Sequence, residues 1–166
     1  MKHLFLFDVD GVLVDARGYL RALQDTVAHF ALRMGVGDPV LTEEEVRAGE
    51  AHGLTSEWDS APTYILALLI ERLRREPSLA LPAPWEDALA VLAARPLTLP
   101  HPNYMTLVAR VGKRRRDFKE TSHAVRAVLR DDAQALPATQ REAVGAILDE
   151  LLRQSRSQKK GSLDIR

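Results

Sequence analysis

Hydrophobic residues along most of this chain recur every three or four positions, which is the spacing of one face of an amphipathic helix. The pattern is clearest over residues 16–34, where the apolar positions are Tyr19, Leu20, Leu23, Val27, Phe30, Ala31 and Met34. Asp15 can cap the start of this segment, and Gly35 can end it. We therefore expect a helix over residues 16–34.

Start and stop signals divide the next part of the chain into a short helix, a loop and a longer helix. Thr42 and Glu45 have the spacing of a capping box, which predicts a short helix through Val46. Residues 53–60, Gly-Leu-Thr-Ser-Glu-Trp-Asp-Ser, predict a loop with Trp58 at its centre. The longer helix follows this loop.

The longer helix is expected to begin at Ser60, because Pro62 lies just inside it and proline favours a first helical turn. It is strongly apolar through Ile70 and ends by Pro77. Further helices are predicted over residues 85–94, 122–129 and 137–152. Residues 104–111 form an apolar patch whose pattern does not distinguish a helix from a strand.

Only the first residues have the pattern of a β-strand. Residues 3–7 form a short, continuous apolar run, which suits a strand buried on both faces. We expect this strand at about residues 2–7, and no other segment has a comparable run rich in valine and isoleucine. The sequence therefore predicts a mainly α fold with one N-terminal strand.

Composition limits the classes of function. The formal net charge is +0, so nothing attracts the whole chain to nucleic acid, and we expect the basic run at residues 110–119 to be a solvated loop. The absence of cysteine excludes disulfides, zinc–thiolate sites and cysteine nucleophiles. No apolar segment approaches the roughly 20 residues that span a bilayer. We expect a cytoplasmic protein without a membrane partner, and no feature indicates its oligomeric state.

The segment that carries chemistry is residues 5–15, which read FLFDVDGVLVD. A buried strand here places Asp8 and Asp10 at its carboxyl end, where ligands bind in open α/β sheets, and Gly11 permits the turn that follows. Two clustered carboxylates repel each other unless a cation or a shared proton compensates their charge. Mg²⁺ is the natural cation for hard oxygen ligands that also meet a phosphate.

This segment resembles the first signature of the haloacid dehalogenase superfamily, Asp-x-Asp-Gly-Val/Thr-Leu-x-Asp. The matching residues are Asp8, Asp10, Gly11, Val12, Leu13 and Asp15. The resemblance implies that Asp8 attacks phosphorus to form an aspartyl-phosphate, while Asp10 protonates the leaving oxygen and later activates water. It also implies that the Asp8 carboxylate and the Asp10 backbone carbonyl bind Mg²⁺. The implied substrate is a small phosphorylated metabolite.

The resemblance implies a division into segments as well. Residues 1–15 correspond to the first strand and nucleophile loop of a Rossmann-type core, and residues 16–99 to a helical cap. A helical C-terminal segment over 100–152 and a basic, flexible tail over 153–166 would follow. The predicted loop resembles a substrate-facing cap loop, whose candidate contact residues are Thr55, Ser56, Trp58 and Asp59. The alternative is that Trp58 seals the helix junction and Ser60 caps the next helix.

Three later signatures of the family are not found in context. The acidic pair Asp131-Asp132 follows a helical segment, Lys113 and Lys119 lie in a polar run, and Thr106 lies in the ambiguous patch. The sequence therefore predicts a truncated α/β hydrolase that has the first strand and the cap. The alternative is a non-catalytic helical remnant or interaction module that has lost the active site.

Overall fold

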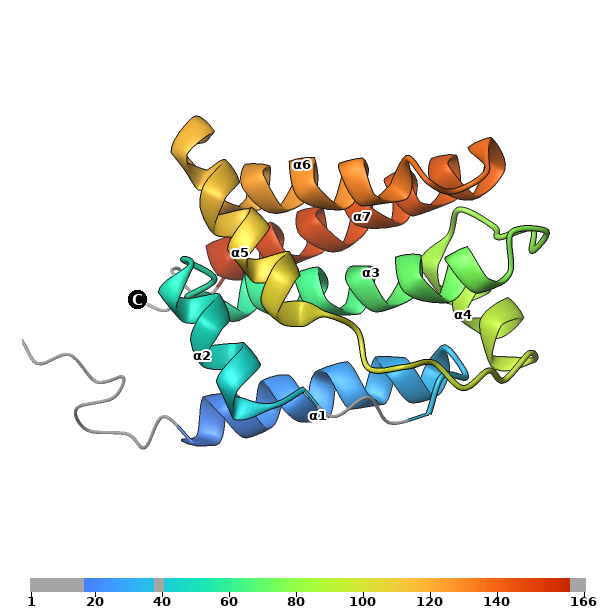
Figure 1. Cartoon of the computed structure of the whole chain (residues 1–166), viewed down its shortest axis with the longest axis horizontal. Coiled ribbons are helices and arrows are strands. Elements are labelled where there is room, and N and C mark those ends of the chain that lie inside the picture. The colour runs from blue at the N-terminus through green and yellow to red at the C-terminus, as the bar shows by residue number, and fades with distance from the viewer. Residues whose placement is uncertain (1–16, 38–40, 162–166) are drawn as a thin grey trace, which may run out of the picture.

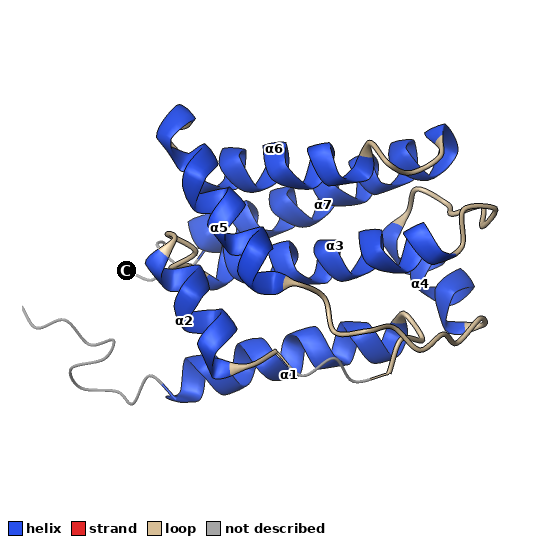
Figure 2. Cartoon of the chain, viewed as in Figure 1, coloured by secondary structure: helices blue, strands red, loops and turns tan. Residues whose placement is uncertain are grey.

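The computed structural model describes residues 17–37 and 41–161, except for the side chains of residues 17, 57, 58 and 154–161. Every regular element in these ranges is helical (Figures 1 and 2). The elements are α1 (Arg17–Arg33), α2 (Glu43–Ala51), α3 (Glu57–Arg75), α4 (Trp85–Ala93), α5 (Tyr104–Arg114), the 3-10 helix η1 (Arg115–Asp117), α6 (Thr121–Ala133) and α7 (Ala138–Gly161). The mainly α prediction is confirmed for the described residues, whereas the strand predicted at residues 2–7 lies outside them.

Helix α3 lies at the centre of a bundle and contacts α1, α6 and α7. Figure 1 shows these four helices lying lengthwise, with α2 and α5 crossing them at one end and α4 at the other. Helix α2 contacts α5, and α1 contacts α4. We call the first of these ends the α2 end; it comprises the start of α1, the α2–α3 turn (residues 52–56) and the α5–α6 connection (residues 113–120).

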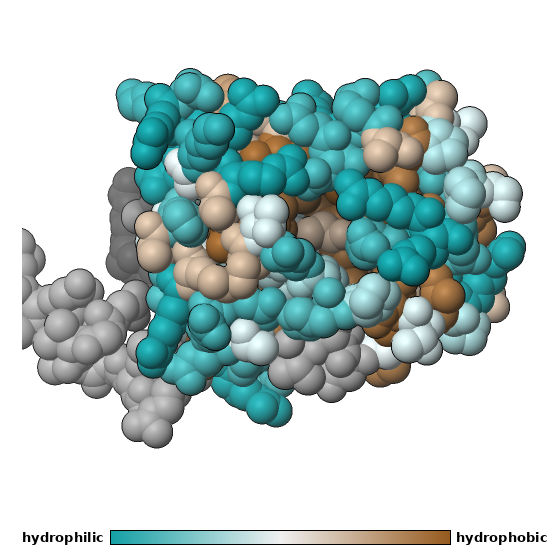
Figure 3. Space-filling model, viewed as in Figure 1, coloured by the Kyte–Doolittle hydropathy of each residue, from teal (hydrophilic) through white to brown (hydrophobic). Residues whose placement is uncertain are grey.

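One hydrophobic core extends through the bundle, from Leu23 in α1 to Leu152 in α7. It forms around α3, which is apolar on nearly all sides, as a helix enclosed by other helices must be. Leu66 and Leu68 in α3 are completely buried, and the face of the molecule in Figure 3 is mostly hydrophilic over this core. The sequence predicted a domain boundary between residues 99 and 100, and the core includes helices on both sides of it. The boundary itself stays a prediction.

The capping box predicted at the start of α2 is confirmed. The Glu45 amide donates to the Thr42 hydroxyl at 3.2 Å, and the Thr42 amide donates to the Glu45 carboxylate at 2.9 Å. Gly35 ends α1 as predicted, with a φ of 67° that favours glycine. A Cβ at Gly35 would lie 3.0 Å from the Leu92 carbonyl oxygen, so the turn also needs glycine for close packing.

The start of α3 was predicted wrongly, because the helix begins at Glu57 and not at Ser60. Ser56 has the N-cap position, and the Ser60 hydroxyl lies inside the helix, 2.9 Å from the Ser56 carbonyl oxygen. Pro62 therefore lies within the helix and not in its first turn. Because proline has no N–H, this helix lacks one backbone hydrogen bond at that position. The charged residues Glu57 and Asp59 hid the first turn from the hydrophobic pattern.

Three C-terminal segments also differ from their predictions. The ambiguous patch is helix α5, which begins where the Asn103 side chain accepts the Thr106 amide at 2.9 Å. Helix α6 extends to Ala133, so it includes the acidic pair predicted at its end. Helix α7 continues beyond Leu152 to Gly161, into the segment that was predicted as a flexible tail.

An arginine with no exposed surface, Arg72, joins α3 to α4. Its guanidinium lies 2.9 Å from the Glu76 carboxylate and donates to the backbone carbonyls of Leu92 and Arg95. Burial lowers the pKa of Arg72, and the charge of Glu76 opposes this effect. The side chain thus binds carbonyls at the C-terminal end of α4 that no residue within α4 can satisfy.

We predict that Arg72→Met lowers the free energy of unfolding by about 3 kcal/mol, because it removes the buried partner of the Glu76 carboxylate and the side-chain donor to the Arg95 carbonyl. Urea unfolding followed by circular dichroism measures this change. The matched control is Arg75→Met, since Arg75 is exposed and its pair with Glu71 spans 3.5 Å. The control should lose under about 0.5 kcal/mol. Equal losses in the two variants would contradict the role of Arg72.

Candidate functional site

The predicted nucleophile and acid–base residues, Asp8 and Asp10, lie outside the described residues, so their roles and their Mg²⁺ site stay predictions. The motif ends at Asp15, two residues before α1 begins. The motif is therefore connected to the bundle through the start of α1. The start of α1 belongs to the α2 end of the bundle.

A hydrogen-bonded chain ties the start of α1 to the start of α3. The Tyr19 hydroxyl donates to the Ser60 hydroxyl at 3.3 Å. The Ser60 side chain is buried, and its hydroxyl also lies 3.2 Å from the Leu54 carbonyl oxygen and 2.9 Å from that of Ser56. The predicted substrate loop and the start of α1 are consequently neighbours.

The predicted substrate residues lie around this turn. Thr55 is exposed, and Ser56 is half-buried at the N-cap position without a side-chain cap bond. Asp59 is half-buried in the first turn of α3, and its carbonyl accepts the Thr63 hydroxyl at 2.6 Å. The side chain of Trp58 lies outside the described residues. Contact with a substrate stays a prediction for all four, whereas the alternative in which Ser60 caps the helix is wrong.

The α5–α6 connection packs on the α2–α3 turn at Gly53. Gly53 has a φ of 92°, and the Arg115 guanidinium occupies the position that a Cβ would take, with Nη1 only 1.6 Å from it. The Thr121 hydroxyl donates to the Gly53 carbonyl at 3.2 Å. The prediction that residues 110–119 form a solvated loop was wrong in part, because residues 110–114 belong to α5. Arg115, in the same run, lies beside the predicted substrate loop.

Several cations without an ion pair to a described carboxylate lie close together in this connection. Most described arginines lie within ion-pair distance of a carboxylate: Arg21, Arg33, Arg47, Arg72, Arg74, Arg75, Arg95, Arg110, Arg114, Arg126 and Arg130. Lys113, Arg115, Arg116 and Lys119 are exposed and form no ion pair with another described residue. The α2 end therefore has a local surplus of positive charge.

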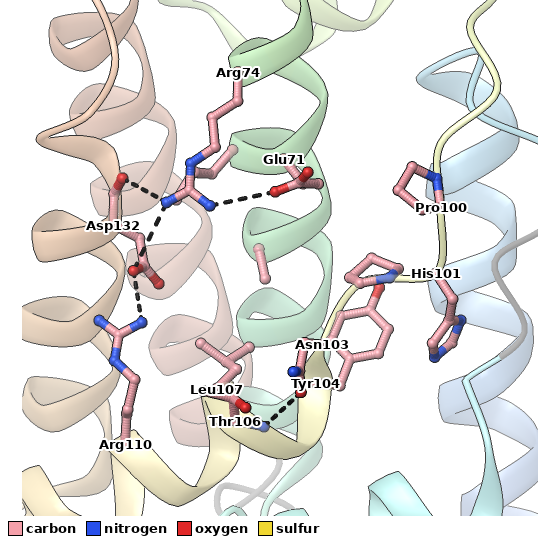
Figure 4. A pocket seen from close by; sticks show the side chains of 13 residues that line it. Glu71, Arg74, Pro100, His101, Asn103, Tyr104, Thr106, Leu107, Arg110 and Asp132 are labelled. Carbon is pink, nitrogen blue, oxygen red and sulfur yellow. Dashed lines mark hydrogen bonds and ion pairs between the residues drawn. The ribbon is translucent and has the colours of Figure 1, made fainter.

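A cavity of about 360 Å³ lies between α3, α5, α6 and the segment before α5 (Figure 4). Arg110 lies 2.6 Å from the Asp132 carboxylate, and Arg74 donates to the Asp132 carbonyl at 3.1 Å. Arg74 also donates to Glu71 at 3.3 Å. Two guanidinium groups and two carboxylates neutralise each other here, so the cavity offers no net charge for a phosphate.

The floor of this cavity includes Tyr104, whose hydroxyl is buried and has no hydrogen-bond partner among the described groups. Burial raises the pKa of Tyr104, and the charge of Glu45 raises it further, so the phenol stays protonated. His101, also on the wall, lies 2.7 Å from the Glu45 carboxylate. The His101–Glu45 contact joins α2 to the segment before α5, and neither Tyr104 nor His101 forms a nucleophile–base pair here.

No family model, curated protein or solved structure matches this chain. The resemblance to the haloacid dehalogenase superfamily therefore depends on residues 5–15 alone. No group of three or more His, Asp or Glu side chains among the described residues could hold a metal ion. None of the helices within 17–37 and 41–161 combines the length and apolar character that crossing a membrane requires.

The residue that sequence reasoning missed is Arg115. Its contact partner Gly53 lies far from it in the sequence, and neither residue belongs to a motif. The available signals were a glycine just after a short helix and a run of cations. Neither signal shows that the two segments meet.

We predict that Gly53→Ala lowers the free energy of unfolding by about 1–2 kcal/mol, because an L side chain is strained at this positive φ. The control is Gly37→Ala, which has a φ of 79° but no atom near the added Cβ. The two variants should lose similar stability in urea unfolding, since the long Arg115 side chain can move aside. A much larger loss at Gly53 would show that the Arg115 contact is rigid.

Proposed function

We propose that this protein is a phosphohydrolase of the haloacid dehalogenase type, which hydrolyses a phosphate monoester through an aspartyl-phosphate on Asp8. The observation that supports it is where the motif joins the bundle. The first turn of α1 is hydrogen-bonded to the start of α3 through Tyr19 and Ser60. The motif therefore leads into the α2 end, which has both the predicted substrate turn and the unpaired cations.

The proposed reaction has two displacements at phosphorus. An Asp8 oxygen forms a bond to phosphorus as the bond to the leaving oxygen breaks, and Asp10 gives its proton to that oxygen. Water, deprotonated by Asp10, then attacks the aspartyl-phosphate, which releases inorganic phosphate and restores Asp8. Negative charge increases around the phosphoryl group in both steps, so nearby cations would stabilise the transition states.

The described residues supply positive charge for a phosphate, but they supply no cluster of ligands for a metal ion. Arg115, held over Gly53, is the best-placed cation for a phosphate at this end. Mg²⁺ would supply further charge neutralisation, but the described residues contain no cluster able to bind it. The Asp8 carboxylate and the Asp10 carbonyl are few protein ligands for an ion that prefers octahedral oxygen geometry. We therefore propose weak Mg²⁺ binding.

We predict that Asp8→Asn abolishes turnover of an aryl phosphate, because the amide keeps the shape of the side chain but is not a nucleophile. The matched control is Asp15→Asn in the same motif. Asp15 is expected to cap α1, so this variant should retain most of the activity. A colorimetric assay of the purified chain at several Mg²⁺ concentrations measures both. Retained activity in Asp8→Asn would overturn the assignment of the nucleophile.

We also predict slow turnover by the unaltered chain, well below a typical enzyme value of about 10 s⁻¹. The sequence contains no clear match to the family's phosphate-binding hydroxyl, steadying lysine or second acidic pair. Loss of one preorganised donor alone can reduce the rate by about 10²–10³. Turnover near 10 s⁻¹ would show that other residues supply these groups.

A second candidate function is a non-catalytic interaction module, and one observation favours it. The acidic pair Asp131-Asp132, the candidate second pair for a metal site, forms ion pairs instead: Asp132 lies 2.6 Å from Arg110, and Asp131 lies 3.0 Å from Arg114. Both carboxylates therefore join α6 to α5. Absence of turnover in both the unaltered chain and Asp8→Asn would support this candidate.

A further inference from the structure

We propose that the basic turn, residues 113–119 between α5 and α6, is a binding site for a nucleoside phosphate. Its unpaired cations would bind the phosphate groups, and Phe118 would stack on the base. If the nucleoside phosphate is the substrate of the hydrolase, the inference rests on the proposed function. As a binding site it does not require hydrolysis.

The first support is the pairing of charges within the turn. Asp117 is the only carboxylate in the turn, and it lies 3.8 Å from Arg114, which also pairs with Asp131 at 3.0 Å. Arg114 thus pairs with α6, and Asp117 lies closest to Arg114 among the cations of the turn. Arg115 and Arg116 keep their charge uncompensated by any described carboxylate, and they are exposed. An exposed guanidinium group without a carboxylate partner is suited to phosphate binding, because it can form two parallel hydrogen bonds to phosphate oxygens.

The second support is the position of Arg115 beside the α2–α3 turn. Its guanidinium lies against the Gly53 backbone, where any larger residue would displace it. The Thr121 hydroxyl bonds to the carbonyl of the same glycine at 3.2 Å, so both ends of the basic turn are held near the α2–α3 turn.

The third support is an exposed aromatic ring among these cations. Phe118 is 36% exposed, although phenylalanine is usually buried. Its amide donates to the Arg115 carbonyl at 3.3 Å, and one side of the ring meets His123 with 6.4 Å between centroids. Bases stack on exposed aromatic rings while cations bind their phosphates. Phe118 with Arg115 and Arg116 provides both contacts within one short turn.

The surroundings favour a mononucleotide over a nucleic acid. The formal net charge of the chain is +0, and α2, which contacts α5, has exposed carboxylates at Glu43, Glu44 and Glu50. Arg47, the only cation in α2, pairs with Glu43. An extended polyanion leaving the basic turn across α2 would meet these carboxylates. One exposed aromatic ring and a few cations match one base and a short phosphate group.

The experiment measures binding of ADP to the full chain by titration calorimetry, with adenosine and inorganic pyrophosphate as partial ligands. The background is Asp8→Asn without Mg²⁺, so that hydrolysis cannot interfere. We expect ADP to bind more tightly than either partial ligand. Arg115→Gln with Arg116→Gln should weaken ADP and pyrophosphate binding about tenfold or more, because charge-assisted hydrogen bonds are lost. Phe118→Ala should weaken ADP binding about fivefold or more and leave pyrophosphate binding unchanged.

The control is Arg141→Gln, which removes one positive charge elsewhere on the bundle. Arg141 is in the first turn of α7, at the opposite end of the bundle from the basic turn (Figure 1), and donates to Gln134 at 3.0 Å. This control should leave ADP binding unchanged. Circular dichroism should show that all the variants, whose changes are at the surface, keep their helices.

Several outcomes overturn the inference: no binding of ADP, equal weakening by Arg141→Gln, or binding of a single-stranded oligonucleotide where ADP does not bind. The last would indicate a nucleic-acid surface. The inference and the proposed function can fail separately. ADP binding that depends on Arg115 without any turnover would retain the site and reject the hydrolase. Turnover that depends on Asp8 without ADP binding would retain the hydrolase and reject the nucleotide site.

Discussion

The buried charge of Arg72 is the constraint on which the rest of the bundle depends. A guanidinium without exposed surface is stable only while Glu76 and the carbonyls after α4 stay within reach. This requirement fixes the C-terminal half of α3 relative to α4, in addition to the apolar side chains that both helices contribute to the core. With α3 held in this position, α1, α6 and α7 can pack on its remaining faces. A polar contact thus determines the geometry of a core that is otherwise hydrophobic.

The sequence predicted those elements whose signals are local. The capping box at Thr42 and Glu45 and the helix end at Gly35 involve neighbouring residues, and both are present. The start of α3 was misplaced because Ser56 and Ser60 are equally good capping residues, and only the three-dimensional structure distinguishes them. The apolar patch at residues 104–111 became assignable as a helix only with the bond from the Thr106 amide to the Asn103 side chain.

The candidate site was less predictable than the fold. Asp8 and Asp10 can be identified from a motif, but the groups around them depend on long-range contacts such as that of Arg115 with Gly53. Periodicity describes one helix at a time and does not show which turns meet at the same end of a bundle. The pairing of charges is equally hidden, because the sequence shows many arginines but not which of them have a carboxylate beside them. Sequence reasoning therefore identified possible chemistry without its surroundings.

The position of α7 along the chain has a consequence for how the protein is made. Helix α3 is apolar on nearly all sides, and one of those sides is covered by α7, the last element described. During synthesis from the N-terminus, this side of α3 stays uncovered until α7 has left the ribosome. The bundle therefore completes its core only once α7 has been synthesised, and until then one apolar side of α3 stays uncovered.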